Sequence, residues 1–167
     1  MNTSRDVSRR ALIGLGVLGA GAVAASRLGL GAEPAQAQTY PFRLSEAEWR
    51  RRLSPAAFNV LREQGTERPY SSPLNEEHRA GTFACAGCGQ PVYRSRTKFE
   101  SGTGWPSFWA AVPDAVGTRR DTSFGMARTE VHCSRCGGHL GHIFNDGPRP
   151  TGQRHCINGV ALTFRPA

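Results

Sequence analysis

The sequence predicts an all-β domain, a sandwich or barrel, that begins with two short helices. Beyond residue 65, short apolar runs recur between Gly and Pro residues, which is typical of short strands joined by tight turns. Before that point, helix-capping residues precede two apolar segments. The 167 residues, 38% hydrophobic and 20% charged, suit one domain with a proper core and exclude a highly charged disordered chain.

Residues 1–37 have the features of an export signal. Three arginines in the first ten residues precede an uncharged segment at 11–26, and an A-x-A cleavage site ends at Ala37. The pair Arg9-Arg10 resembles a twin-arginine signal, with an ordinary secretory signal or an uncleaved anchor as alternatives. The uncharged segment is too short for a comfortable membrane span. We expect a periplasmic or otherwise exported protein whose domain covers 38–167, with no membrane span after cleavage.

Two short helices are expected between 45 and 64. Ser45 and Glu48 form a capping box, in which each side chain bonds the other residue's backbone N–H. Pro55 suits the first position of the second helix, and Gly65 is expected to close that helix.

The strands are expected where apolar residues gather between turn signals. These segments are 82–85, 91–93, 108–112, 124–132, 140–144 and 160–164. Their length and spacing favour a single all-β domain over alternating strands and helices.

Four of the five cysteines form two CxxC pairs. The pairs are Cys85 with Cys88 and Cys133 with Cys136. Two such turns supply the four thiolates of a closed structural zinc site, so we expect one Zn²⁺ per chain. Two disulfides are the alternative in an oxidising compartment, and an iron–sulfur cluster also takes four cysteines. Export of an already folded protein would let zinc bind in the reducing cytoplasm and protect the thiols from oxidation before export.

Cys156 is the one cysteine outside these pairs, which makes it the candidate nucleophile. It lies in Arg154-His155-Cys156-Ile157-Asn158, where cationic and polar neighbours are able to lower a thiol pKa. Two histidines, His139 and His142, are not needed by a four-thiolate site. A lone cysteine is more often buried and inert, but this neighbourhood favours the nucleophile.

Several long segments together carry a resemblance to a known family. They are FACAGCG (83–89), KFESGTGWPSF (98–108), RTEVHCSRCGGHLGHIFNDGP (128–148), PTGQRHCINGVALTF (150–164) and GTERP (65–69). With these segments the chain resembles the B-type methionine sulfoxide reductases, the peptide-methionine (R)-S-oxide reductases. The resemblance covers 43–165 in family order. It implies two antiparallel sheets in a tent-like sandwich, short N-terminal helices and a structural zinc.

The resemblance also implies the roles of the site residues. Cys156 would attack the sulfoxide sulfur and become a sulfenic acid, while the departing oxygen takes a proton. His139 or His142 would deliver that proton, since histidine titrates near neutral pH. The remaining implied residues are Trp105 and Phe144 as walls for the substrate methyl group, with Arg154, Asn158 and Asp146 as polar active-site groups.

One position departs from the family pattern. Many members have a resolving cysteine where this chain has Thr103. With the CxxC thiols committed to metal, we expect an external reductant, a thioredoxin-like protein or a small thiol, to resolve the sulfenic acid. The expected substrates are methionine sulfoxide in proteins or free, and the expected state is a monomer.

The formal charge of +8 invites a nucleic-acid reading, which the arginine distribution argues against. The arginines are scattered rather than arranged as a stripe, and the one triple run at 50–52 suits a solvated helix face. We therefore expect no nucleic-acid partner. Two alternatives remain: an exported zinc-ribbon-type binding module without activity, and a thiol–disulfide oxidoreductase that uses one CxxC pair.

Overall fold

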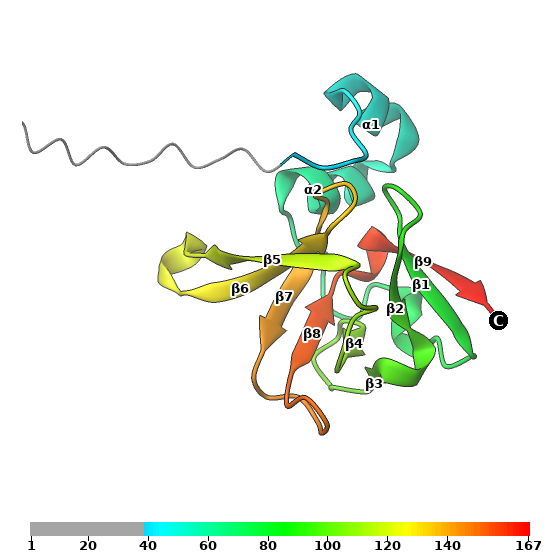
Figure 1. Cartoon of the computed structure of the whole chain (residues 1–167), viewed down its shortest axis with the longest axis vertical. Coiled ribbons are helices and arrows are strands. Elements are labelled where there is room, and N and C mark those ends of the chain that lie inside the picture. Colours follow the sequence, from blue (N-terminus) through cyan, green and yellow to red (C-terminus); the bar gives the residue numbers. More distant parts are fainter. Residues whose placement is uncertain (1–38) are drawn as a thin grey trace, which may run out of the picture. The chain divides into compact units, whose positions relative to one another are not determined.

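The computed structural model describes residues 39–167, so the export signal expected at 1–37 lies outside the described residues. Two helices, α1 (Glu46–Arg52) and α2 (Pro55–Glu63), precede nine strands in two antiparallel sheets (Figure 1). The strands are β1 (Gly81–Cys85), β2 (Pro91–Arg94), β3 (Lys98–Phe99), β4 (Ser107–Phe108), β5 (Val116–Asp121), β6 (Arg128–Cys133), β7 (His139–Phe144), β8 (Arg154–Ile157) and β9 (Leu162–Pro166). The predicted fold class is confirmed. Within the described part of the chain, no helix is long and apolar enough to cross a bilayer.

The two helices begin as the sequence predicts, but the second ends differently. Ser45 and Glu48 form the capping box of α1, and Pro55 opens α2. The expectation that Gly65 closes α2 was wrong: Gln64 takes the left-handed conformation at φ 58°. Gly65 follows that residue, and its N–H donates to the Asn59 carbonyl oxygen at 2.9 Å.

The smaller sheet has the strand order β2-β1-β9 and the larger one the order β3-β4-β8-β7-β6-β5. All of the strand pairs are antiparallel. In the larger sheet β8 lies between β4 and β7, and its two middle residues, His155 and Cys156, have a partner on each side. This central strand carries Cys156.

Three predicted strands were too long or displaced, and three observed strands were not predicted. The segment 108–112 contributes only β4, 124–132 becomes a strand at Arg128 after a 3-10 turn, and 160–164 starts as a 3-10 turn before β9. The missed strands are β3, β5 and β8. β5 is an edge strand with mostly exposed side chains, and β8 is buried at three of four positions, so neither shows alternation.

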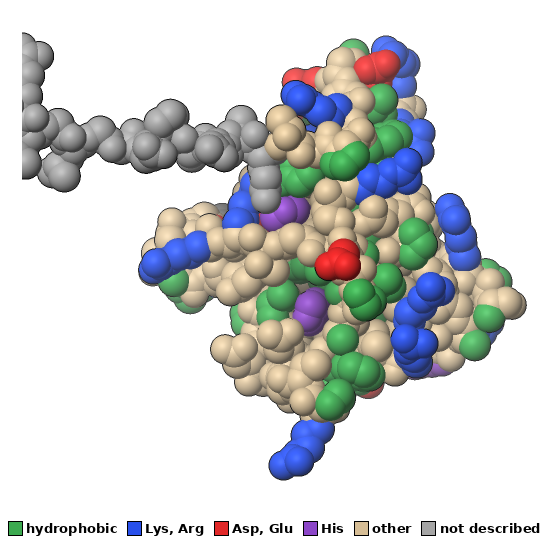
Figure 2. Space-filling view, viewed as in Figure 1, with side chains coloured by type: hydrophobic (Ala, Val, Ile, Leu, Met, Phe, Trp, Pro, Cys, Tyr) green, Lys and Arg blue, Asp and Glu red, His purple; other side chains and the backbone are tan. Residues whose placement is uncertain are grey.

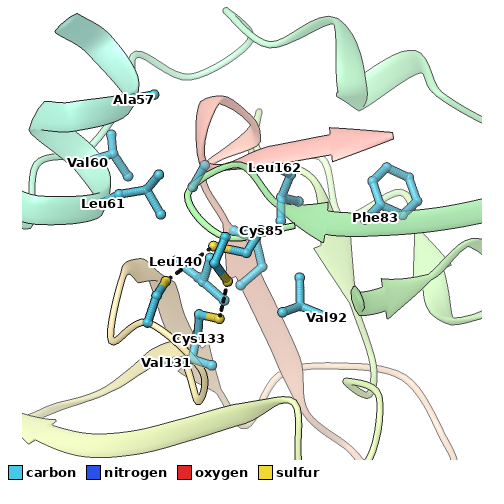
Figure 3. Packing of buried hydrophobic residues seen from close by; sticks show 14 of the residues in the cluster. Ala57, Val60, Leu61, Phe83, Cys85, Val92, Val131, Cys133, Leu140 and Leu162 are labelled. Carbon is cyan, nitrogen blue, oxygen red and sulfur yellow. Dashed lines mark hydrogen bonds between the residues drawn. The ribbon is translucent and has the colours of Figure 1, made fainter. Parts of the chain in front are cut away.

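The core fills the space between the two sheets and beneath the helices. The rings of Tyr93 and Phe108 stack with centroids 4.3 Å apart, which joins the smaller sheet to the larger one. Phe83 contacts Phe108 edge-on at 5.0 Å. At the helical end, Leu61 and Leu140 are buried with the CxxC cysteines (Figure 3). The helices therefore cover the cysteine cluster and leave the centre of β8 open to one face.

Candidate active site and metal centre

Cys156 is half-buried in the middle of β8. Its Cα partners are Ser107 on β4 and His142 on β7. Successive residues of a strand point to opposite faces, and Arg154 accordingly acts on the Cys156 thiol by hydrogen bonding and charge. His155 points the other way, with its Nδ1 3.1 Å from the Tyr93 hydroxyl in the core.

A cavity of about 140 Å³ opens beside Cys156. It brings together five residues that the sequence singled out: Trp105, His142, Phe144, Cys156 and Asn158. Thr66, Arg128 and Gly141 complete its wall. The glycine is required there, because a Cβ would lie 2.0 Å from the Cys156 carbonyl oxygen. A thiol, an indole, an imidazole and an amide thus face one small space.

The environment of the Cys156 thiol differs from the expectation. Burial raises the pKa of Cys156 above its usual value, although a hydrogen bond from Thr103 and the charge of Arg154 both lower it. The Thr103 hydroxyl oxygen lies 3.9 Å from Cys156 Sγ. The cationic flank therefore acts as predicted but is outweighed by burial, which the sequence does not reveal.

The two histidines have separate partners. His142 Nε2 lies 2.8 Å from a carboxylate oxygen of Asp121, whereas His139 Nδ1 lies 2.7 Å from Glu130. Burial lowers the pKa of His142, against the opposing effect of Asp121. Only His142 lines the cavity with Cys156; His139 lies three residues earlier on β7, at a neighbouring cavity.

Sequence reasoning missed both carboxylates that hold these histidines. Glu130 is buried on β6, where Arg119 also pairs with it. Burial raises the pKa of Glu130, but hydrogen bonds from His139 and Arg119 outweigh it and leave that pKa below its usual value. Asp121 ends β5 and is bound by Ser123 as well as His142, which lowers its pKa. β6 is the mixed segment RTEVHC, so no local pattern in the sequence marks Glu130 as buried.

Arg154 and Asp146 form an ion pair beside the cavity. The guanidinium donates to both carboxylate oxygens of Asp146, each at 2.9 Å. It also lies 4.5 Å from the centre of the Phe144 ring. Asp146 is itself mostly exposed and does not line the cavity, so its contact with the site runs through Arg154.

Glu67 was also missed, although it connects several site residues. Its carboxylate accepts the backbone N–H groups of Gly159 and Val160. Its own N–H donates to the Asn158 side chain at 3.0 Å, and its carbonyl accepts the Trp105 indole N–H at 3.2 Å. This residue fixes the turn that follows Cys156 and one edge of the indole.

The four CxxC cysteines meet in one cluster at the helical end of the core. Their sulfur atoms all lie within 4.8 Å of one another. Cys85 and Cys136 are 3.7 Å apart, and Cys88 and Cys133 are 3.6 Å apart (Figure 3). A tetrahedron with metal–sulfur bonds of about 2.3 Å has edges of roughly 3.8 Å, whereas a disulfide needs about 2.05 Å. The donor set therefore fits one metal ion better than two disulfides.

A larger cavity is present among the described residues. It has a volume of about 750 Å³ between α2 and β9, and neither cysteine nor histidine lines it. Since it offers no thiol and no imidazole, the small cavity at Cys156 is the candidate active site.

The fold and these two centres define a cysteine-based two-sheet β domain with a separate metal-binding cluster. A family model described as SelR domain matches residues 53–166. Curated relatives named peptide methionine sulfoxide reductase MsrB include one from Bradyrhizobium diazoefficiens, 57% identical over 123 residues, which are 73% of this chain and 88% of the relative. Others are from Methanosarcina barkeri, at 55% over 122 residues (72% and 86%), and Leifsonia xyli subsp. xyli, at 53% over 129 residues (76% and 93%). The chain belongs to the SelR-domain family.

Proposed function

We propose that this chain reduces methionine (R)-sulfoxide to methionine with Cys156 as the nucleophile. The Cys156 sulfur attacks the sulfoxide sulfur and forms an S–S bond while the oxygen takes a proton. Transfer of that oxygen to the Cys156 sulfur then breaks the S–O and the S–S bond, which releases methionine and leaves a Cys156 sulfenic acid. One thiol and one sulfoxide thus give one sulfenic acid and one thioether. The convergence of Cys156, Trp105 and His142 on one small cavity carries this proposal. The family's many reductases support the same activity.

The cavity residues suit distinct tasks in this reaction. The Trp105 indole and the Phe144 ring offer apolar walls for the sulfoxide methyl group. His142 is the proposed proton donor, because it faces Cys156 across the sheet while His139 does not line the cavity. Arg154 stabilises the thiolate through its charge, and Asn158, held by Leu140 and Glu67, offers its polar side chain at the cavity wall.

An external thiol completes the proposed cycle. No cysteine other than Cys156 lines the cavity, and Thr103 stands where a resolving thiol would be needed. Two thiols of a thioredoxin-like protein or of a small reductant would return Cys156 to the thiol, forming their own disulfide and water. The substrates would be methionine sulfoxide in proteins and free methionine sulfoxide.

We further propose zinc as the metal and an exported, monomeric protein as its physiological form. Cys85, Cys88, Cys133 and Cys136 would hold the ion with no open position, so its contribution is structural. The signal at 1–37 would direct the folded domain, 38–167, to the periplasm. Export to the periplasm is supported by the order of features in this signal, which has paired arginines, then an uncharged segment and then an A-x-A site.

A stereospecific assay tests the activity. Purified protein should convert the R epimer of a methionine sulfoxide peptide in the presence of a dithiol and leave the S epimer intact. Cys156→Ser should remove turnover, while Thr103→Ser, which preserves the neighbouring hydroxyl, should retain most of it. No turnover by the wild type would favour the alternative of an exported binding module without activity.

A further inference from the structure

Three arginines donate hydrogen bonds to the backbone of the two CxxC turns. Arg52 Nε on α1 lies 2.6 Å from the Gly87 carbonyl oxygen, in the first turn. Arg62 Nη1 on α2 lies 3.0 Å from the Cys136 carbonyl oxygen, in the second turn. Arg135, itself in the second turn, reaches back to the Cys88 carbonyl oxygen of the first at 3.3 Å. These three side chains are called the arginine collar below.

Aromatic rings hold the collar in place. The guanidinium groups of Arg52 and Arg135 lie 5.7 and 5.4 Å from the centre of the same ring, Phe42. Arg62 lies 4.9 Å from the ring of Trp49, which is buried. Cation–π contacts at these distances restrict long, exposed side chains. Several arginine side chains gather at the helical end of the domain (Figure 2).

The chemistry of the cluster gives such a collar a purpose. Four deprotonated thiols around one divalent cation carry a net charge of about −2. The four cysteines are buried, so solvent offsets that charge only weakly. Guanidinium groups that are hydrogen-bonded to the carbonyls of both turns offset this negative charge from outside the ligand shell. They also hold the backbone of the turns that position the sulfur atoms. Partners of this kind outside the ligand shell typically change metal affinity by about 10 to 100-fold.

We propose that Arg52, Arg62 and Arg135 act together as positioning residues that retain the metal ion in the four-cysteine cluster. The inference rests on the metal proposed above and is independent of the reductase reaction. Arg52 and its ring partner Phe42 precede the segment 53–166 that the family model matches. Part of the collar therefore belongs to the N-terminal portion of this chain, which the family match does not cover.

The test measures metal release from the full zinc-loaded chain. Zinc transfer to a chromophoric chelator is followed for the wild type, for Arg52→Met, Arg62→Met and Arg135→Met, and for the three changes combined. Arg51→Met is the matched control, since Arg51 is a neighbouring exposed arginine on α1 that makes no hydrogen bond to either turn within the described part of the chain. Arg→Lys changes at the collar positions keep the charge and lose the guanidinium fork.

The triple variant should release zinc about tenfold or more faster than the wild type, and each single variant less. The lysine variants should recover part of the retention, and the difference from the wild type should shrink as salt rises, because salt screens exposed charges. The control should stay within about twofold of the wild type.

Several results would overturn the collar. The triple variant could release zinc at the wild-type rate, or Arg51→Met could accelerate release as much as the collar variants do. Release could also be accelerated to the same extent at every salt concentration and in the lysine variants, which would indicate a loss of packing alone. If the triple variant fails to fold by circular dichroism, the single variants decide by the same criteria. A wild-type protein that binds no zinc would also overturn it, whereas the sulfoxide assay would still report on the reaction at Cys156.

Discussion

Replacing Thr103 by cysteine should convert the proposed external resolution of the sulfenic acid into an internal one. The Thr103 hydroxyl oxygen lies 3.9 Å from Cys156 Sγ. A disulfide brings two sulfur atoms to about 2.05 Å, so an approach of roughly 1.9 Å is needed. Side-chain rotation and the loop can supply it, since Gly102 and Gly104 flank the position with φ of 68° and 89°.

The energetic consequences of Thr103→Cys can be worked from the same geometry. Positions 103 and 156 are 53 residues apart, so chain entropy predicts that the cross-link stabilises the oxidised form by about 4 kcal/mol, an upper estimate because the metal cluster already restricts this segment. The change removes the bond between the Thr103 hydroxyl and Ser101, 2.8 Å long, at a cost of about 1 kcal/mol. The oxidised variant should therefore exceed the wild type by up to about 3 kcal/mol in free energy of unfolding.

Intact mass after one turnover without reductant provides the assay. The oxidised wild type should be one oxygen heavier than its reduced form and react with dimedone, because its sulfenic acid persists. Oxidised Thr103→Cys should be two hydrogens lighter than its reduced form and unreactive, since the introduced thiol displaces water. Thr103→Ser is the control and should behave as the wild type. An internal disulfide in the wild type would refute the reasoning, because it would mean that a metal-cluster cysteine reaches Cys156.

Three further outcomes are expected. Burial lowers the pKa of His155 to about 4, so between pH 6.5 and 4 the unfolded chain binds this proton and the folded chain does not. As pH falls through that window, the free energy of unfolding of the wild type should therefore decrease by about 3 kcal/mol more than that of His155→Phe. Urea denaturation at several pH values measures this difference. The rate of Cys156 alkylation should keep rising with pH above the range in which an ordinary thiol titrates, and the midpoint of this pH dependence should be higher still in Arg154→Met. A rate that is already constant below pH 8 would contradict the effect of burial. Glu67→Ala should lower the free energy of unfolding by about 2 kcal/mol and also lower kcat/KM, because the N–H groups of Gly159 and Val160 lose their acceptor. Glu63→Ala, at an exposed position, is the control and should change neither quantity, as measured by denaturation and by the reductase assay.

The features predictable from sequence are those that a few adjacent residues determine. The capping box at Ser45, the start of α2 at Pro55 and the pairing of the CxxC cysteines each depend on a short pattern. The strand β8 has no such pattern, because Arg154, His155 and Ile157 are all buried although they point to opposite faces. Its position follows from neighbours ten or more residues away.

The missed site residues depend on sheet register in the same way. Glu130 meets His139 and Arg119 only because β5, β6 and β7 pair in one register. The error in the expected pKa of Cys156 has the same origin. The charge of Arg154 is visible in the sequence, whereas the burial that outweighs it arises from segments brought together by folding.

The four-cysteine cluster and the candidate active site are linked through a single hairpin. Cys133 ends β6, the second CxxC turn follows, and β7 runs directly from that turn to His142, opposite Cys156. A one-residue slip of β7 would send every side chain of that strand to the other face. The turn limits such a slip, since Gly137 takes a φ of 69° and the Cys133 N–H is bonded to the Gly138 carbonyl. A metal ion held by the thiolates of this turn would thereby fix His142, so the proposed ion would act on the proposed reaction without touching the substrate.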